Sequence, residues 1–247
     1  MAMDSGYYAA LSGYLARSQA LDTAANNLSN AGTTGFRAET DFFRDAVLGP
    51  NASGSQLNGV VNNFGVLGGN DIDLGQGQLT PTGNPLDVAI EGSGFFAVQT
   101  ANGVRYTRDG SFRRARNGTL VTTENDLVLG TNGKPIVAPE GKIDISPDGT
   151  VSVRGGVSGK LAVMDFPAGT QITPEGTTLY RAPQGAAKPT ASAVLHQGNL
   201  EGSNLNVVQA TMRLMMVQRQ AETMQRALSL FYSEFNKTAT EDLPKVE

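Results

Sequence analysis

Five carboxylates near the middle of the chain are the side chains best suited to acid–base chemistry. They are Asp71, Asp73, Asp87, Glu91 and Asp109. A glycoside hydrolase places two such groups on either side of its scissile bond. The spacing singles out no pair here, so carboxylates at solvated strand ends and turns are the simpler interpretation. With no Trp and 6% aromatic residues, the chain is also poorly supplied for stacking on sugars.

The composition of the chain excludes several kinds of metal site and catalytic nucleophile. There is no Cys and a single His, His196, which excludes disulfides, thiolate ligands, Cys nucleophiles and multi-His metal sites. Residues 144–149 resemble the start of a calcium loop, but Gly155 stands where that loop needs its acidic ligand. A Pro-Asp-Gly hairpin turn explains them better. We therefore predict no catalytic, cofactor or metal site, and no enzyme.

Charge and hydropathy limit the classes of partner. The 247 residues carry a net charge of −4 with scattered Lys and Arg, which does not indicate a nucleic-acid surface. No apolar run reaches the roughly 18 residues of a membrane span. The first residues lack a basic segment followed by an apolar one, so we expect no cleavable signal peptide. Charged residues make up 17%, below the roughly 25% usual for soluble domains, which indicates surface that is covered by a partner.

The N-terminal region has the apolar spacing of a helix. A seam with alternating steps of four and three residues consists of Tyr7, Leu11, Tyr14, Ser18, Leu21, Ala25 and Leu28. This spacing predicts a helix with a heptad stripe. Asp4 or Ser5 is its expected N-cap.

The C-terminal region carries the same spacing without a polar member. Its seam consists of Val207, Ala210, Leu214, Val217, Ala221, Met224, Leu228, Phe231 and Phe235. We expect Asn204 or Asn206 to cap the helix. Two interpretations stay open: packing on the chain's own core, or a coiled coil with the N-terminal helix and with neighbouring subunits. We favour the second, because two sparsely charged helices have more apolar surface than one pair needs.

The stretch between the helices is rich in β signals. Short apolar runs such as 86–90, 95–98, 143–145 and 161–164 are separated by turn dipeptides. These dipeptides are Asn102-Gly103, Asp109-Gly110, Asn117-Gly118, Asn132-Gly133 and Asp148-Gly149. We predict an α+β protein with a terminal-helix domain (1–36 and 203–247), an extended linker (37–71) and a hairpin-rich β domain (72–202).

The residues from Ala25 to Arg37 close the first helix in a distinctive way. The run Ala-Asn-Asn-Leu-Ser-Asn-Ala-Gly-Thr-Thr-Gly-Phe-Arg resembles the signature A-N-N-L-x-N-x-x-T-x-G-F-K/R of the bacterial flagellar axial proteins of rod and hook. Three further motifs of that family follow in order, at residues 82–96, 106–112 and 198–204. The resemblance therefore covers nearly the whole chain. The length of the chain is short for a hook protein and suits the proximal and the distal rod proteins alike, whereas Glu201-Gly202-Ser203-Asn204 favours the proximal rod proteins.

The resemblance implies a structural subunit rather than an enzyme. It implies terminal helices that line a helical tube, an outer β domain, export through the flagellar type III apparatus, and a place in the basal-body rod that crosses the periplasm and transmits torque. The expected partners are further copies and other axial proteins. The residues that we predict to make the assembly contacts are Tyr7, Leu11, Tyr14, Leu21, Asn26, Asn27, Leu28, Asn30, Gly35, Phe36, Leu214, Val217, Ala221, Met224, Leu228, Phe231 and Phe235.

Overall fold

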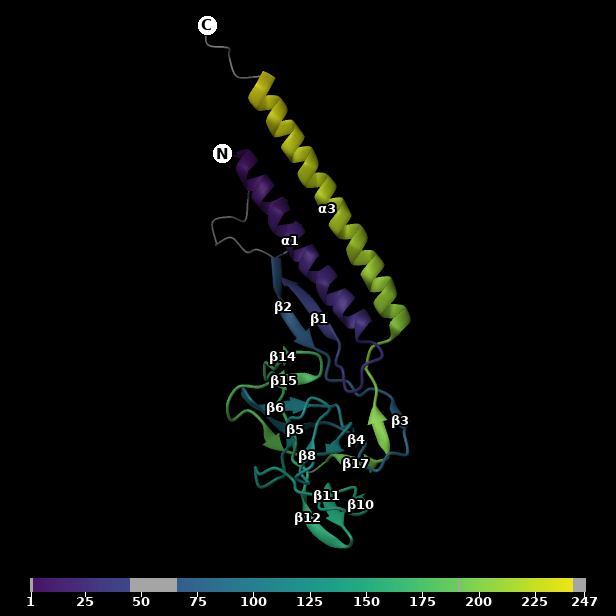
Figure 1. Ribbon diagram of the computed structural model, residues 1–247. Coiled ribbons are helices and arrows are strands. Elements are labelled where there is room, and N and C mark those ends of the chain that lie inside the picture. The colour runs from purple at the N-terminus through teal and green to yellow at the C-terminus, as the bar shows by residue number, and fades with distance from the viewer. Residues whose placement is uncertain (1, 45–65, 191, 242–247) are drawn as a thin grey trace. The chain divides into compact units, whose positions relative to one another are not determined.

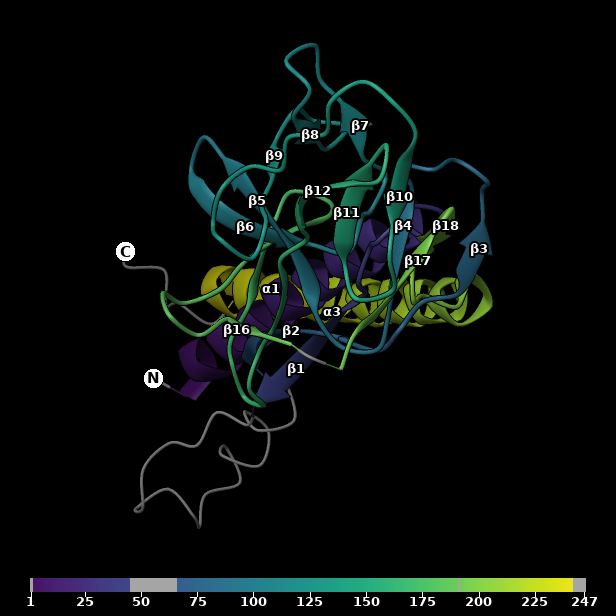
Figure 2. The same ribbon diagram turned by 90° about the horizontal axis from the view of Figure 1, so that it is seen from below.

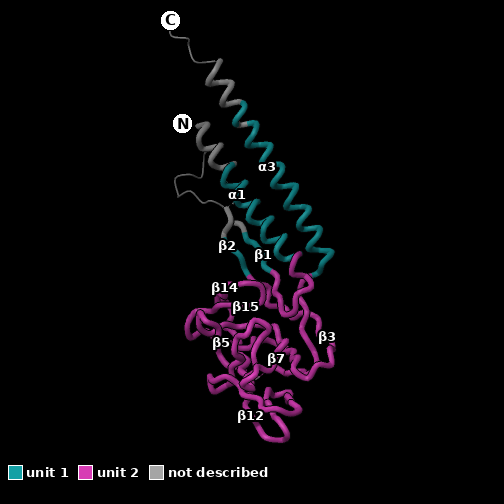
Figure 3. The backbone as a smooth tube through the Cα atoms, in the orientation of Figure 1, with its two compact units in different colours: residues 1–28, 39–71, 206–247 teal, residues 29–38, 72–205 magenta. Residues whose placement is uncertain are grey.

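The chain forms two compact units, which a computed structural model describes for residues 2–44, 66–190 and 192–241 (Figure 1). Side chains are described for residues 11–42, 69–190, 192–230, 232 and 233. The helical unit comprises residues 1–28, 39–71 and 206–247, and the β unit comprises residues 29–38 and 72–205 (Figure 3). Helices and a large β region together confirm the α+β class.

The helical unit contains two long helices and a two-stranded sheet. Its elements are α1 (Ala2–Ser29), β1 (Glu39–Arg44), β2 (Val66–Ile72) and α3 (Val207–Glu241). The two helices run in opposite directions (Figure 1). β1 and β2 pair with each other inside the segment predicted as an extended linker. The predicted division into a terminal-helix domain, an extended linker and a β domain stays a prediction.

The helix ends agree only in part with the expected caps. Asn206 caps α3, since its side-chain oxygen accepts a hydrogen bond from the Gln209 amide at 3.1 Å. The expected cap of α1 is wrong, because that helix already begins at Ala2 and includes Asp4 and Ser5. Neither described helix has the combination of length and apolar character that a membrane span requires.

The β unit is built from short antiparallel strands. They are β3 (Leu79–Pro81), β4 (Val88–Glu91), β5 (Phe95–Thr100), β6 (Gly103–Thr107), β7 (Arg113–Arg114), β8 (Leu120–Val121), β9 (Leu127–Val128), β10 (Ile143–Ile145), β11 (Thr150–Val153), β12 (Gly156–Lys160), β13 (Val163–Asp165), β14 (Thr173–Glu175), β15 (Leu179–Arg181), β16 (Lys188–Pro189), β17 (Val194–Gln197) and β18 (Asn199–Glu201).

These strands form one large sheet and three small ones. The large sheet has the order β14-β15-β6-β5-β9-β8-β7, with β13 joining β5 and β16 to it. A separate sheet has the order β10-β11-β12. Two further pairs, β17 with β4 and β18 with β3, join strands about 100 residues apart in the sequence (Figure 2). The last strands of the β unit therefore pair with its first ones.

One apolar core holds these sheets together. Its fully buried members include Val88, Ile90, Phe96, Val98, Leu120, Val128, Val151 and Leu161. The four predicted β runs all contribute to this core or to strands around it. No βαβ crossover occurs among the described strands, whose given registers are all antiparallel.

Four of the five predicted turn dipeptides place their glycine at positive φ. Gly103, Gly118, Gly133 and Gly149 have φ angles of 103°, 83°, 70° and 88°. Gly110 differs: a Cβ there would lie 1.7 Å from the Val88 carbonyl oxygen. Glycine at that position therefore permits a close backbone approach, and the prediction of a tight turn at Asp109-Gly110 is wrong.

Candidate functional site

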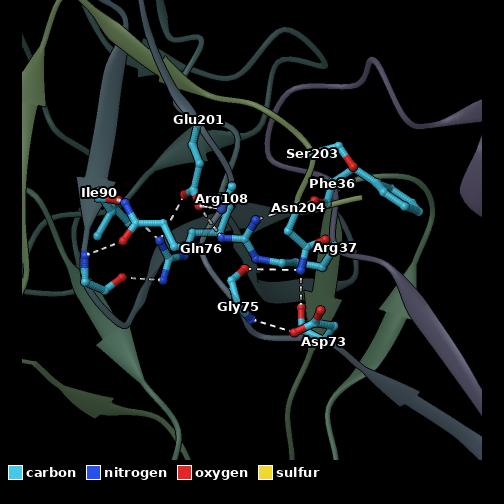
Figure 4. Close-up of polar contacts among 12 residues, drawn as sticks. Phe36, Arg37, Asp73, Gly75, Gln76, Ile90, Arg108, Glu201, Ser203 and Asn204 are labelled. Atoms are coloured by element: carbon cyan, nitrogen blue, oxygen red, sulfur yellow. Dashed lines mark hydrogen bonds and ion pairs between the residues drawn. The ribbon is translucent and has the colours of Figure 1, made fainter. Parts of the chain in front are cut away.

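A buried cluster of three charged side chains lies inside the β unit. Arg37 comes from the segment that follows α1, Arg108 follows β6, and Glu201 ends β18. Arg37 Nη2 donates to Glu201 Oε1 at 2.6 Å, and Arg108 Nη1 donates to Glu201 Oε2 at 2.9 Å (Figure 4). The three side chains are at most 2% exposed. One carboxylate thus bridges two guanidinium groups that are far apart in the sequence.

Backbone groups complete the surroundings of Glu201. The Gly77 amide donates to Glu201 Oε1 at 2.8 Å, and the Gly35 amide donates to the Glu201 carbonyl oxygen at 2.8 Å. Since buried carboxylates are stable only with such donors, the position needs an acidic residue.

Arg108 makes further contacts besides the one with Glu201. Its Nη2 donates to the Gly92 carbonyl oxygen at 2.7 Å, and its guanidinium lies 5.1 Å from the centre of the Phe95 ring. Burial lowers the pKa of Arg108, and the nearby Arg37 lowers it too, whereas Glu201 acts in the opposite direction. Glu201 is therefore the group that favours a charged Arg108 in this apolar surrounding.

Asn204 fastens the neighbouring backbone segments. Its side-chain oxygen accepts a hydrogen bond from the Ala38 amide at 2.9 Å. Its Nδ2 donates to the carbonyl oxygens of Asp73 at 2.9 Å and Gly75 at 3.1 Å (Figure 4). A single amide side chain thereby provides the hydrogen-bond partner of three backbone groups, as a neighbouring strand would.

Gly35 lies where the segment after α1 meets the loop after β6. Its φ is +70°, and a Cβ would lie 2.3 Å from the Asp109 amide nitrogen. Only glycine meets both conditions. The predicted residues Gly35 and Phe36 are both buried, with Phe36 3% exposed.

Four of the five carboxylates considered for catalysis, Asp73, Asp87, Glu91 and Asp109, hold turns or strand ends instead. Asp87 accepts hydrogen bonds from Thr82 at 2.6 Å and Asn84 at 2.7 Å, and Asp109 accepts one from the Ser111 amide at 3.0 Å. Within the described part of the chain, no three His, Cys, Asp or Glu residues are grouped to hold a metal ion.

Two further candidates also take part in local contacts. Glu91 pairs with His196, whose Nε2 lies 2.5 Å from Glu91 Oε2 at the surface. The Asp73 carboxylate accepts the Gly75 amide at 2.8 Å. These contacts hold turns and strand ends.

The three asparagines at the end of α1 have different environments. Asn27 is buried and binds the backbone of Glu39 through both its oxygen, at 2.9 Å, and its Nδ2, at 2.7 Å. Asn30 accepts a hydrogen bond from the Thr33 side chain at 3.2 Å. Asn26 is exposed. Asn27 therefore joins α1 to β1 inside the helical unit.

α1 buries a different stripe from the one its large side chains form. Ala16, Ala20 and Ala24 are 5%, 2% and 3% exposed. Beside them, Thr23 lies within hydrogen-bond distance of Asn70 on β2. The predicted seam residues Leu11, Tyr14, Leu21 and Leu28 are only half-buried. Small residues four apart were the signal for the buried stripe, and the sequence reasoning overlooked it.

From Ala210 to Leu228 the predicted seam is the less exposed face of α3, whereas Val207 at its start is 52% exposed. Val217 is buried, and Leu214, Ala221, Met224 and Leu228 are half-buried. By contrast, Met212, Met215 and Met216 are 57%, 55% and 59% exposed. The side chains of Tyr7, Phe231 and Phe235 lie outside the described ones. That the seam residues make assembly contacts stays a prediction.

The arginine–glutamate cluster was missed as a site, although all three residues belong to the sequence motifs. An available signal was that two of these motifs carry an arginine and a third carries a glutamate of opposite charge. Pairing could not be deduced, because Arg37 and Glu201 are 164 residues apart.

Two protein-family models match the chain. The model described as flagella basal body rod protein matches residues 8–37, which end at Arg37. The model described as flagellar hook protein FlgE/F/G D1 domain matches residues 89–153, which include Arg108. The matched parts thus lie in α1 with the segment after it, and in the centre of the β unit.

Curated relatives extend the similarity over the full length. The flagellar basal-body rod protein FlgF of Caulobacter vibrioides is 34% identical over 249 residues, covering 99% of this chain and 100% of that protein. FlgF of Mesorhizobium japonicum is 39% identical over 44% of this chain and 43% of its own length. The flagellar basal-body rod protein FlgG of Borreliella burgdorferi is 31% identical over 90% of this chain and 92% of its own length. From the end-to-end match and the two family models, the chain belongs to the family of flagellar basal-body rod proteins.

Proposed function

We propose that the chain is a structural subunit of the flagellar basal-body rod, of the FlgF type. The end-to-end similarity to a FlgF at 34% identity carries this proposal. The carboxylates weighed for catalysis hold turns and strand ends, which agrees with a structural role. The subunit assembles with further copies and with other axial proteins in the basal body, after passage through the flagellar export apparatus.

The terminal helices are the elements through which we propose that it assembles. α3 exposes more than half of each of Met212, Met215 and Met216, and the large side chains of α1 are only half-buried. Burial of apolar surface contributes roughly 25 cal/mol per Å², so repeated contacts along a tube add up to several kcal/mol per subunit. Pairing of the two helices as a coiled coil, and their packing against neighbouring helices, belong to this proposal.

Truncation tests this assembly mechanism. A chain lacking residues 207–247 should fail to enter rods, while the β unit keeps its cooperative unfolding transition. Val157→Ser serves as the matched control, since Val157 is an exposed apolar residue of the β unit at 75% exposure. The control should assemble normally. Rods that contain the truncated chain would disprove assembly through α3.

A distal-rod role of the FlgG type is the second candidate, supported by the FlgG relative that covers 90% of the chain. Complementation separates the two. We expect the gene to restore swimming to a bacterium that lacks its FlgF and not to one that lacks its FlgG. The reverse result would assign the chain to the FlgG type.

A further inference from the structure

An apolar groove with basic edges runs along α3. It is lined by Met212, Met215, Met216 and Met224, together with Arg219, two uncharged polar residues of α3 and, from α1, Arg17. The first three methionines are each more than half exposed. Among the described residues that line the groove, two are arginines and none is a carboxylate. Flexible methionines with flanking positive charge suit a helix ridge that carries both an apolar and an acidic residue.

α1 presents such a ridge. Leu15, Gln19, Asp22 and Asn26 follow one another at steps of four, three and four residues, and all four are exposed. Leu15 is 58% exposed. The surface hollow beside them includes Asp22 and Glu39, and no basic side chain is among its described lining residues. The ridge therefore combines an apolar residue with the opposite charge to that of the groove.

Ridge and groove lie on opposite sides of α1. A helix turns about 100° per residue. Arg17, at the edge of the groove, therefore projects about 200° around the axis from Leu15. One copy can then offer its ridge to one neighbour and its groove to another. Contacts of this kind are heterologous, and they extend into an open helical array.

The two surfaces also match in length and direction. At about 1.5 Å per residue, the ridge from Leu15 to Asn26 is about 17 Å long and the groove from Met212 to Met224 is about 18 Å long. α1 and α3 run in opposite directions within the helical unit (Figure 1). Copies that point the same way along a tube keep this relation between neighbours. Leu15 then lies at the Met224 end, Asn26 at the Met212 end, and Asp22 within reach of Arg219.

We propose that the ridge Leu15–Gln19–Asp22–Asn26 of one copy docks into the methionine groove of a second copy, with Asp22 paired to Arg219. This inference rests on the proposed function and specifies the contact through which the helices assemble. Asp22 sets the register, because it is the acidic member of the ridge and Arg219 is the basic residue on the α3 side of the groove.

Charge reversal tests the pairing in the full-length protein. Asp22→Arg and Arg219→Asp each place like charges together, and the double variant restores an opposite pair. We expect each single variant to raise the concentration needed for association about fivefold, in line with the strength of exposed ion pairs. The double variant should return to within about twofold of the original value. Sedimentation of the purified protein and swimming of a strain that carries each variant are the measurements.

The controls separate this inference from the proposed function. Glu124→Arg reverses an exposed charge on the β unit and should leave association unchanged. Thermal unfolding of each variant establishes that it is folded. If truncation of α3 abolishes assembly but the single reversals have no effect, or the folded double variant stays defective, the ridge-and-groove contact is wrong and assembly through the helices stands. If the truncated chain assembles, both are wrong.

Discussion

Glu201 joins three stretches of chain, at residues 35–37, 77 and 108, through side-chain and backbone hydrogen bonds. It is fully buried, so water cannot replace any of these contacts. Removing one partner of a buried ion pair leaves the other charge without compensation. At the scale of single residues, Glu201 therefore holds three separate stretches of the β unit together.

Replacing Glu201 by Gln should strongly destabilise the β unit. The substitution keeps the shape but leaves Arg37 and Arg108 buried without a counter-charge. We expect a loss of about 3–5 kcal/mol in the free energy of unfolding, measured by urea denaturation. Glu124→Gln, at an exposed position, should change it by less than about 0.5 kcal/mol. A loss below about 1 kcal/mol for Glu201→Gln would contradict the role assigned to the cluster.

Asp148 should make the stability of the β unit depend on pH at the acidic end. Hydrogen bonds from Thr150, and Lys160 beside it, lower the pKa of Asp148 from 3.8 to about 2. A carboxyl group whose pKa is lowered in the folded state stabilises the protein at pH values above its unfolded-state pKa. This contribution is lost as the pH falls from about 4 toward 2.

The comparison that checks this is the melting temperature of Asp148→Asn against the original protein. The two should differ at pH 5 and approach each other near pH 2. Parallel curves across this range would show that Asp148 does not contribute in this way.

At the scale of elements, the end of α1 is where the chain passes from the helical unit into the β unit. The Asn27 side chain binds the Glu39 backbone on one side of this passage. Gly35 and Arg37 bind the Glu201 region on the other side. Different residues of the motif at 25–37 thus make contacts inside each of the two units.

Asn27→Ala should weaken the attachment of β1 to α1. It removes two part-buried hydrogen bonds and leaves the amide and carbonyl of Glu39 without these partners, which costs about 2 kcal/mol. Hydrogen exchange at the Glu39 amide should become faster. Asn26→Ala, one position away and exposed, is the matched control and should leave that rate unchanged. Equal exchange rates in both variants would show that the Asn27 side chain does not hold the Glu39 backbone.

Gly35→Ala should destabilise the contact between the segment after α1 and the loop after β6, through a steric clash as well as backbone strain. The left-handed conformation costs a non-glycine residue about 1–2 kcal/mol, and forcing in a Cβ 2.3 Å from the Asp109 nitrogen adds about 1–3 kcal/mol. Gly83→Ala isolates the first effect, because Gly83 has φ +74° and no atom within 4 Å of its Cβ position. Unfolding measurements should therefore show a clearly larger loss for Gly35→Ala. Similar losses would mean that the close approach to Asp109 relaxes without cost.

At the scale of the molecule, the two units differ in how much apolar surface they bury. The β unit has a continuous core of fully buried side chains. The helical unit buries mainly alanines from α1, while α3 keeps Met212, Met215 and Met216 exposed. In the assembly that we propose, such a unit gains stability when other copies cover it.

Assembly should therefore order the terminal helices. In the purified monomer we expect fast amide exchange from Leu11 to Leu28 and slow exchange in the β-unit core, because helices with little buried surface open locally. In assembled rods, the same helix amides should become protected by a factor of at least about ten. Strong protection of residues 11–28 in the monomer would contradict this expectation.

The local pattern of residues was enough to predict the α+β class, both helices and most of the tight turns. Helix spacing and Asn-Gly or Asp-Gly pairs act over a few residues, so they can be read from the chain directly. The motifs also led to the right family. The tertiary structure decided which residues meet: Glu201 with Arg37 and Arg108, Asn27 with Glu39, and β17 and β18 with β4 and β3. It also decided that α1 buries Ala16, Ala20 and Ala24 rather than the larger side chains of its predicted seam that the structure describes. These outcomes depend on contacts between segments far apart in the sequence, and local spacing carries no information about such partners.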